Sequence, residues 1–259
     1  MGKSSIPACE VTRYSGNYLV LKHDVETDVP RALQMAKIEN KFGHRGSYYV
    51  QAYLLNDKKN VQMLKMIQQM GNEVSYHYDV MDSNKGSLEQ AIFEFDENRA
   101  LFEHNGFPFL TVCQHGNPVV DRVGYTSNRD FFRSDLVQKK YSDILDIMVN
   151  FKSRVPTEYL YFSDAGRKFR LIYDPINNDV VNSDEKNIAF EDLDGVLNGM
   201  DGEVGNIIST HPHRWTKSAA IYIIRNTVFQ CVKAVAKTII KIPAFKKILS
   251  RYYYLAKKF

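Results

Sequence analysis

An apolar run that ends in ionisable side chains near the start of the chain constrains the fold most strongly. Residues 19–26 read Leu-Val-Leu-Lys-His-Asp-Val-Glu, and a helical pattern follows at once. This order predicts a buried strand that carries polar groups to its C-terminal end, where α/β enzymes place their chemistry. Since side chains alternate along a strand, Asp24 and Glu26 point to one face and His23 and Val25 to the other. Alone, the acidic pair also fits a solvated pair at a helix N-terminus.

Three later runs of β-type residues end in histidine, and such runs alternate with helical patterns. We expect strands at residues 46–52, 72–78, 109–113, 159–162 and 205–210. We expect helices at residues 30–42, 61–70, 88–102, 141–150 and 189–200, with irregular segments at 128–134 and 174–186. Strands that alternate with helices favour parallel pairing through right-handed crossovers. The pattern therefore predicts a barrel-like α/β fold, with an open doubly wound sheet as the alternative.

Composition narrows the class of protein. The 259 residues suffice for one large α/β domain, and no apolar run is long enough to span a bilayer. Glycine-rich nucleotide-binding loops are absent from the sequence, which disfavours a nucleotide enzyme. The three cysteines, Cys9, Cys113 and Cys231, lie far apart and form no metal-type pair. Because the N-terminus carries no apolar signal region, we expect a cytoplasmic protein.

The charge is unevenly distributed. From Thr216 onward there are ten basic residues and no acidic ones, which leaves 24 basic and 30 acidic residues in residues 1–215. We therefore expect a catalytic domain at 1–215 and a basic amphipathic helical tail at 216–259. The tail either packs on the barrel or adsorbs to an anionic membrane surface, at the inner face of the membrane. No recognised nucleic-acid module accompanies the charge, so we expect no nucleic-acid partner.

Polar residues follow the ends of the predicted strands. Because the C-terminal ends of parallel strands meet at one rim, we expect them to converge. They are Asp24, Glu26, His77, His115, Asp164, Arg167 and His211. A carboxylate with two imidazoles suits Zn²⁺ or a similar divalent ion and leaves a position open for water. Such an ion acidifies the water and polarises a carbonyl, which suits amide or ester hydrolysis.

Five motifs resemble a known family in their order and spacing. They are His-Asp-Val-Glu at 23–26, Gly-Asn-Glu-Val-Ser-Tyr-His at 71–77, Cys-Gln-His-Gly at 113–116, Ser-Asp-Ala-Gly-Arg at 163–167 and Thr-His-Pro-His-Arg-Trp at 210–215. From about residue 19 to Trp215 the chain resembles a divergent branch of the polysaccharide deacetylases, the NodB-homology domain of carbohydrate esterase family 4. The resemblance implies a distorted (β/α)7-type barrel that uses a divalent metal to remove N-acetyl groups from sugars.

The resemblance also implies roles for individual residues. Asp24 matches the general base, Glu26 and His77 match metal ligands, and His211 matches the acid that protonates the leaving amine. Two departures leave alternatives open. Met81 stands where the family has its second metal histidine, so His115 is the candidate replacement, with Asp79 behind it. Val25 interrupts the acidic pair, so Asp24 and Glu26 can exchange the roles of base and ligand.

The remaining motif residues have two interpretations each. Asp164 and Arg167 form a structural ion pair or orient the base, and we favour the second. His213 and Arg214 contact an anionic substrate group or a nearby loop. Trp215 is a core residue or a platform for a sugar ring. The predicted cofactor is one divalent ion, with zinc favoured over cobalt, nickel and iron.

These observations predict a metal-dependent hydrolase that removes an N-acetyl group from a sugar in surface-polysaccharide biosynthesis. A cytoplasmic location favours a nucleotide-linked or lipid-linked sugar precursor as its partner. Two alternatives remain. One is a catalytically silent, metal-bearing subunit that binds or assembles glycans, which the missing second histidine permits. The other is an amidohydrolase that acts on a small cyclic amide with the same chemistry.

Overall fold

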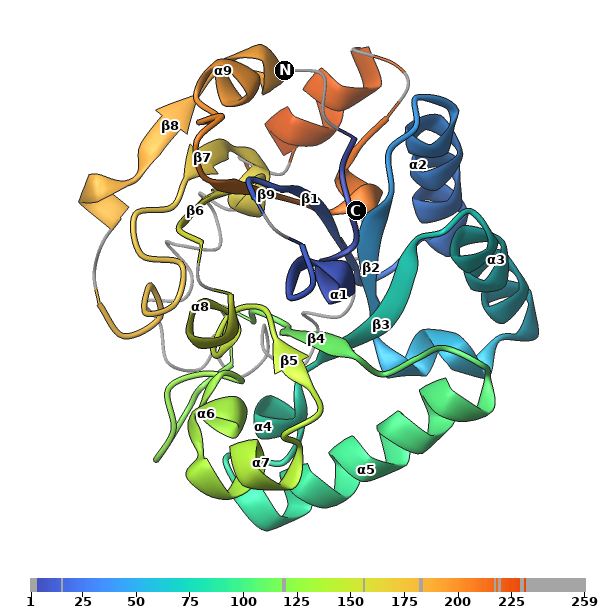
Figure 1. Cartoon of the computed structure of the whole chain (residues 1–259), viewed down its shortest axis with the longest axis vertical. Coiled ribbons are helices and arrows are strands. Elements are labelled where there is room, and N and C mark those ends of the chain that lie inside the picture. Colours follow the sequence, from blue (N-terminus) through green and yellow to red (C-terminus); the bar gives the residue numbers. More distant parts are fainter. Residues whose placement is uncertain are drawn as a thin grey trace.

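The computed structural model describes residues 4–14, 16–117, 120–155, 157–181, 184–216, 218, 220–228 and 231. Within these residues, nine strands form one sheet in the order β5-β4-β3-β2-β1-β9-β6-β7-β8 (Figure 1). Neighbouring strands from β5 to β6 in this order pair in parallel, whereas β7 and β8 extend the sheet in antiparallel fashion. The strand ends that were expected to share a rim therefore do share one.

The elements have the following bounds. The strands are β1 (Leu19–Val25), β2 (Gly46–Val50), β3 (Glu73–Tyr78), β4 (Thr111–Gln114), β5 (Leu145–Asp146), β6 (Tyr159–Ser163), β7 (Phe169–Leu171), β8 (Ile188–Phe190) and β9 (Gly205–Thr210). The α-helices are α1 (Ala8–Val11), α2 (Val29–Lys41), α3 (Lys58–Gln69), α4 (Val80–Ser83), α5 (Leu88–His104), α6 (Asp130–Arg133), α7 (Asp135–Lys140), α8 (Phe151–Arg154) and α9 (Leu193–Asn198). Short 3₁₀ helices are η1 (Ala52–Asn56), η2 (Ala165–Arg167), η3 (Asp184–Lys186) and η4 (Pro212–Arg214).

A buried cluster inside the curved sheet joins strands from both ends of the parallel region. Its members include Leu145 of β5 and Tyr161 of β6, although five strands lie between these two in the sheet order. A flat sheet would hold β5 and β6 far apart, since neighbouring strands are about 4.8 Å apart. The sheet therefore curves into a barrel whose hydrogen-bonded ladder is not closed, and α8 lies beside the open seam (Figure 1). The predicted α/β barrel is confirmed.

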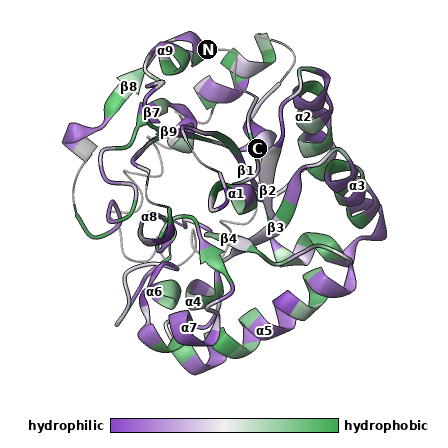
Figure 2. Cartoon of the chain, viewed as in Figure 1, coloured by the Kyte–Doolittle hydropathy of each residue, from purple (hydrophilic) through white to green (hydrophobic). Residues whose placement is uncertain are grey.

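Two further clusters cover the outside of the barrel. The larger one packs α2, α3 and α5 against β2, β3 and β4, and the smaller one packs α9 against β6 and β9. Hydrophilic and hydrophobic residues alternate along these helices (Figure 2), as expected for helices with one buried face. At the start of α2, the Asp28 side chain accepts a hydrogen bond from the Arg31 backbone N–H (3.2 Å), which begins the helix directly after β1.

The predicted elements are mostly present, with corrections in the second half of the chain. The helix predicted at 141–150 is wrong, because this segment contains β5. The fully buried Asp146 accepts hydrogen bonds from the backbone N–H groups of Met148 and Val149, which turns the chain there. The helix predicted at 189–200 is shorter, because its start is fixed by Asp192, whose side chain caps α9. The segment 128–134, predicted as irregular, contains α6.

The predicted basic tail is described only in part. Residues 220–228 are helical, as its apolar spacing predicts. Residues 232–259, with most of the tail's basic side chains, lie outside the described residues. Among helices in the described part of the chain, none combines the length and the apolar composition needed to cross a membrane.

The packing beside the open seam leads to a prediction about the stability of the fold. Phe151 of α8 is buried and its ring packs edge-on against Tyr18 and Tyr159. Phe151→Ala should lower the free energy of unfolding by about 3–5 kcal/mol, because it empties the barrel interior beside the seam. Phe93→Ala is the matched control, since Phe93 is 66% exposed and its loss should change this energy by less than about 0.5 kcal/mol. Urea unfolding of both variants tests this, and equal stabilities would contradict it.

Candidate active site

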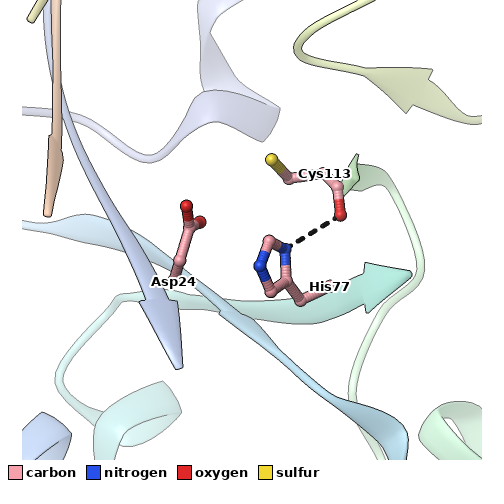
Figure 3. Close-up of side chains that lie close together, drawn as sticks. All are labelled: Asp24, His77 and Cys113. Atoms are coloured by element: carbon pink, nitrogen blue, oxygen red, sulfur yellow. Dashed lines mark hydrogen bonds between the residues drawn. The ribbon is translucent and has the colours of Figure 1, made fainter. Parts of the chain in front are cut away.

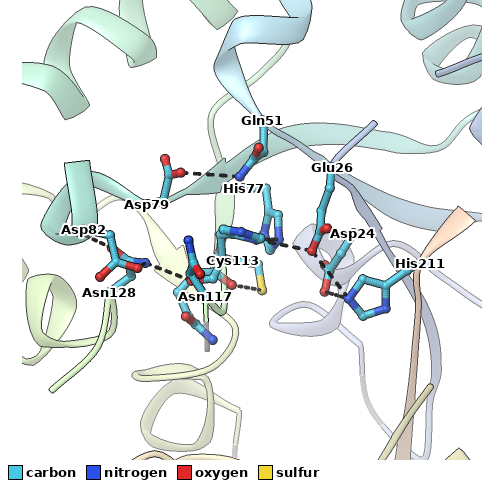
Figure 4. A network of polar contacts seen from close by, with 12 residues as sticks. Asp24, Glu26, Gln51, His77, Asp79, Asp82, Cys113, Asn117, Asn128 and His211 are labelled. Carbon is cyan, nitrogen blue, oxygen red and sulfur yellow. Dashed lines mark hydrogen bonds and ion pairs between the residues drawn. The ribbon is translucent and has the colours of Figure 1, made fainter. Parts of the chain in front are cut away.

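Polar side chains from four strands gather at the C-terminal rim of the barrel (Figure 4). Asp24 is the second-last residue of β1 and Glu26 follows this strand, His77 lies on β3, His115 follows β4, and His211 follows β9. The exposed fraction of each is 8% or less. Five residues that are far apart in sequence are therefore brought together, as the rule for parallel strand ends predicts.

Glu26, His77 and His115 offer ligand atoms close enough to share one ion. His115 Nδ1 lies 3.3 Å from His77 Nε2 and 3.3 Å from Glu26 Oε1. A tetrahedral zinc site, with ligands at about 2.0–2.1 Å from the ion, separates neighbouring donor atoms by about 3.3 Å. One carboxylate and two imidazoles at this spacing therefore fit a divalent cation.

Contacts behind the two histidines fix their ring orientations. His77 Nδ1 is 3.1 Å from the Cys113 carbonyl oxygen, which directs Nε2 toward the cluster. The His115 backbone N–H donates to the Tyr78 carbonyl (2.7 Å), and the buried Asn128 side chain donates to the His115 carbonyl (2.9 Å). Asn128 in turn bonds Asp82 (2.8 Å). The segment before α6 therefore supports the rim of the site.

Asp24 forms a buried ion pair with Lys22, which lies two residues earlier on the same face of β1. Lys22 Nζ is 2.5 Å from Asp24 Oδ2 and 3.1 Å from Ser209 Oγ. Burial acts to raise the pKa of the Asp24 carboxyl, but the charge of Lys22, with smaller contributions from His77 and His211, lowers this pKa to about 2. Asp24 Oδ1 is buried and accepts no hydrogen bond from the described residues. Asp24 is therefore ionised, with one oxygen held by Lys22.

Cys113 belongs to a second group of potential ligands, which shares His77 with the first (Figure 3). Its Sγ lies within 4.8 Å of ligand atoms of Asp24 and His77. Two facts make this group the poorer cation site. Lys22 already neutralises Asp24, so a cation there would lie beside an ammonium group. Burial also raises the pKa of the Cys113 thiol, which favours the protonated form.

His211 is held from behind by Asp164, the residue after β6. His211 Nδ1 is 2.5 Å from Asp164 Oδ1, and the His211 backbone N–H donates to Asp164 Oδ2 (3.1 Å). Trp215 Nε1 also donates to Oδ2 (3.0 Å), and Arg214 lies 3.5 Å from Oδ1. Burial acts to raise the pKa of the Asp164 carboxyl, but His211 and these donors lower it overall. Asp164 is therefore an ionised carboxylate that orients the imidazole.

The opposite edge of the His211 ring faces the two carboxylates. His211 Nε2 is 3.7 Å from Asp24 Oδ2 and 3.8 Å from Glu26 Oε1. In Figure 4 the carboxylates lie between His211 on one side and His77 on the other. The atom of His211 that can exchange a proton with a bound molecule is thus Nε2, because Nδ1 is engaged by Asp164.

The other predicted site residues lie around this centre. Arg167 is buried, its backbone N–H donates to the Asp164 carbonyl (3.0 Å), and its side chain lines a cavity with Trp215. The ring centroid of His213 is 5.9 Å from that of His211, and its carbonyl accepts a hydrogen bond from Arg31 (2.9 Å). Met81 is buried, as is usual for an apolar side chain.

Sequence reasoning missed two residues of the site. Lys22 shares the face of Asp24 because they are two positions apart, and a lysine inside an apolar strand was the available signal. Cys113 was noted only as part of the motif at 113–116 and as a cysteine far from the other two, although it pairs with His77 in the ladder between β3 and β4. On the outer face of β1, His23 contacts Thr210 (2.7 Å) and Glu39 (3.0 Å), so it lies away from the cluster, as alternation predicts.

Comparisons with known proteins return matches only among solved structures. No protein-family model and no curated protein matches the chain. A family 4 carbohydrate esterase from Streptomyces lividans is 14% identical, with a TM-score of 0.44, and the match covers 85% of this chain and 90% of that one. The catalytic domain of a peptidoglycan N-acetylglucosamine deacetylase from Eubacterium rectale is 12% identical, with a TM-score of 0.46 and coverages of 85% and 86%.

A family 4 carbohydrate esterase pseudoenzyme from Bacillus anthracis is also similar. It is 13% identical, with a TM-score of 0.42, and the match covers 83% of this chain and 61% of that one. Two of these three structures are named as members of carbohydrate esterase family 4. Because identity and TM-score are low, the chemistry of this chain has to be inferred from its own residues.

The Asp24–Lys22 pair predicts how stability depends on pH. The pKa of Asp24 is about 2 in the folded protein and 3.8 as a free group, so its ionised form stabilises the fold above pH 4. This stabilisation, about 2 kcal/mol, should disappear as the pH falls from about 4 toward 2. Asp24→Asn should therefore destabilise the protein at pH 7, and its difference from wild type should shrink in acid.

Urea unfolding in the presence of a chelator, between pH 7 and pH 3, measures this difference. The exposed Asp194→Asn is the control and should follow the wild type at every pH. A difference between Asp24→Asn and wild type that stays constant over this range would contradict the assignment of the ion pair.

Proposed function

We propose that this protein is a metal-dependent hydrolase that removes an N-acetyl group from a sugar. One observation carries the proposal: a ligand set for a divalent ion, Glu26 with His77 and His115, adjoins both a lysine-paired carboxylate and an aspartate-held histidine. Amide hydrolysis needs these three parts, since water must lose a proton, the carbonyl must be polarised and the leaving amine must gain a proton.

Glu26, His77 and His115 would hold the ion, and zinc suits this set, although cobalt, nickel or iron would also fit. When bound, a divalent ion polarises the amide carbonyl and lowers the pKa of water. The Glu26 carboxylate suits a cation because its partners among the described residues are imidazoles rather than a permanent ammonium group. Removing this residue or either histidine would leave too few protein ligands for a stable site.

Asp24 is the proposed general base. Its Oδ2 is held by Lys22, which leaves Oδ1 to accept a proton from the attacking water. A carboxylate with a pKa of about 2 is a weak base, so it can serve only for a water that is already acidified. The same pairing keeps Asp24 deprotonated throughout the physiological pH range.

His211 is the proposed general acid, with Asp164 as the residue that positions it. Water adds its oxygen to the carbonyl carbon, and the bond from this carbon to nitrogen then breaks. His211 Nε2 would give its proton to the departing nitrogen, while Asp164 stabilises the charged ring through Nδ1. The products are acetate and a free amino sugar.

We further propose a role in surface-polysaccharide biosynthesis, inside the cell and at the inner face of the membrane. The support is the charge of the tail, which carries ten basic residues and no acidic ones. An anionic leaflet would attract this segment and hold the barrel near lipid-linked glycans.

One alternative is a catalytically silent subunit that binds glycans. Met81 favours it, because a buried apolar side chain stands where the resembled family has a metal histidine. An amidohydrolase that acts on a small cyclic amide is the other alternative. Acetate release from a panel of N-acetylated sugars, with and without chelator, separates the three. Chelator-sensitive acetate release supports the deacetylase, ring opening of a cyclic amide supports the amidohydrolase, and glycan binding without reaction supports the silent subunit.

The ligand set predicts metal content. His77→Ala and His115→Ala should each lose most of the bound metal, because two remaining ligands hold a divalent ion weakly. His104→Ala changes an exposed histidine at the end of α5 and should keep full occupancy. Elemental analysis after dialysis measures this. If His115→Ala stays fully loaded, another residue completes the site, and Asp79 is the next candidate.

If Asp24 and His211 transfer protons, replacing either of them should lower the rate of catalysis without loss of metal. Asp24→Asn and His211→Ala should each lower kcat by a factor of about 10² to 10⁴ while metal stays bound. Asp164→Asn should lower kcat less, because it disturbs the orientation of His211 and leaves the imidazole in place. Acetate release and metal content are measured on the same samples. An unchanged kcat in His211→Ala would exclude it as the acid.

A further inference from the structure

The helix at residues 220–228 turns side chains with polar groups toward the barrel and aliphatic side chains away from it. Tyr222, Arg225 and Asn226 are three and four residues apart, so they lie on one face of the helix. On this face Tyr222 lines a cavity of the barrel, and Asn226 Oδ1 is buried. The aliphatic residues Ile221, Ile223, Ile224 and Val228 are exposed. A helix that packs on its own protein has the opposite arrangement.

The exposed residues form a continuous apolar surface. Ile221, Ile224 and Val228 are three and four residues apart and make a stripe along the helix. Ile223 adjoins this stripe, and it and Ile224 are each 62% exposed. Apolar side chains that gather on a surface in this way mark a contact with a partner or a membrane. Of the two alternatives for the tail, packing on the barrel therefore does not account for this face of the helix.

The helix lies at the rim that carries the proposed acid. It follows η4, and its Tyr222 lines the same cavity as Asp164 and Trp215. Asp164 in turn holds His211 through Nδ1 (2.5 Å). A partner that covers the apolar face of the helix would therefore lie beside the candidate active site rather than at the other end of the barrel.

The charge near the helix fits an anionic bilayer better than a second copy of the chain. From Thr216 onward the sequence has ten basic residues and no acidic ones. Two copies that met through their helices would bring two such segments together, and like charges repel. An anionic leaflet attracts basic side chains, while the boundary of its acyl chains takes up aliphatic ones.

We propose that the helix at 220–228 docks on an anionic phospholipid bilayer and inserts its exposed aliphatic face at the boundary between headgroups and acyl chains. Docking through this face brings the rim with His211 next to the membrane, so the substrate is an N-acetyl sugar linked to a lipid. The substrate part rests on the deacetylase function proposed above. The docking part rests on the exposed helix face, whereas the membrane role proposed above rests on charge alone.

The first experiment measures binding to vesicles, by co-sedimentation of the whole chain with equal parts of phosphatidylglycerol and phosphatidylcholine. The double variant Ile223→Gln/Ile224→Gln should bind at least tenfold more weakly than wild type, because it keeps every charge and loses apolar area. The matched control is Val180→Gln/Val181→Gln, which changes two adjacent aliphatic residues that are similarly exposed in another part of the chain. This control should bind like wild type.

Three outcomes would overturn the docking proposal. The first is a wild type that does not bind these vesicles. The second is equal binding by the two double variants, which would assign vesicle binding to the basic charge without the helix face. The third is a wild-type dimer that Ile223→Gln/Ile224→Gln converts to a monomer, because a second copy would then cover the face. Sedimentation velocity measures the oligomeric state, and urea unfolding shows whether both double variants are folded.

The second experiment tests the substrate part. Acetate release is measured from a prenyl diphosphate N-acetylglucosamine embedded in the same vesicles and from a soluble nucleoside diphosphate N-acetylglucosamine. We expect kcat/KM to be at least tenfold higher for the embedded compound, and Ile223→Gln/Ile224→Gln to lower this ratio. A soluble compound that reacts as well overturns the lipid-linked substrate and leaves the deacetylase standing. Vesicle binding without acetate release from either compound refutes the deacetylase and leaves the docking surface standing.

Discussion

The site depends on a separate partner for each of three buried carboxylates. Asp24, Glu26 and Asp164 are all nearly excluded from water, where an unpaired carboxylate would cost several kcal/mol. Each has a partner of its own, since Lys22 pairs with Asp24, His115 with Glu26 and His211 with Asp164. Three separate pairs let carboxylates of the same charge gather at one rim and remain ionised. They also fix the geometry before any ligand arrives, which is how a preorganised site lowers a reaction barrier.

Much of this arrangement could be predicted from local rules. Alternation along β1 placed Asp24 and Glu26 on one face, and parallel pairing placed the residues that follow β3, β4 and β9 at the same rim. The strand at 205–210 has the predicted bounds: it begins at a glycine, has Ile207 and Ile208 at its centre and is followed by a histidine. These inferences held because they needed only the direction of each strand and the order of side chains along it.

Other features could not be predicted from local patterns, because they depend on contacts between distant parts of the chain. The segment 141–150 has helical spacing, but the buried Asp146 binds Tyr78 and nearby backbone, and this long-range contact makes it a strand and a turn. Asp164 and Arg167 are three residues apart and suggested an ion pair, whereas Asp164 pairs with His211 and Arg214, about fifty residues away. Spacing in sequence does not reveal which of several cations reaches a carboxylate.

Lys22 also bears on a question that the motifs left open, the division of labour between Asp24 and Glu26. Both carboxylates are buried within reach of His77, so proximity alone makes either a ligand. The difference is electrostatic, because an ammonium group 2.5 Å from Asp24 opposes a second cation there, whereas Glu26 faces imidazoles that can be neutral. In the proposed function, a divalent ion would therefore bind at Glu26, and Asp24 would be the carboxylate that takes a proton. One lysine on the first strand would thus separate the two proposed roles.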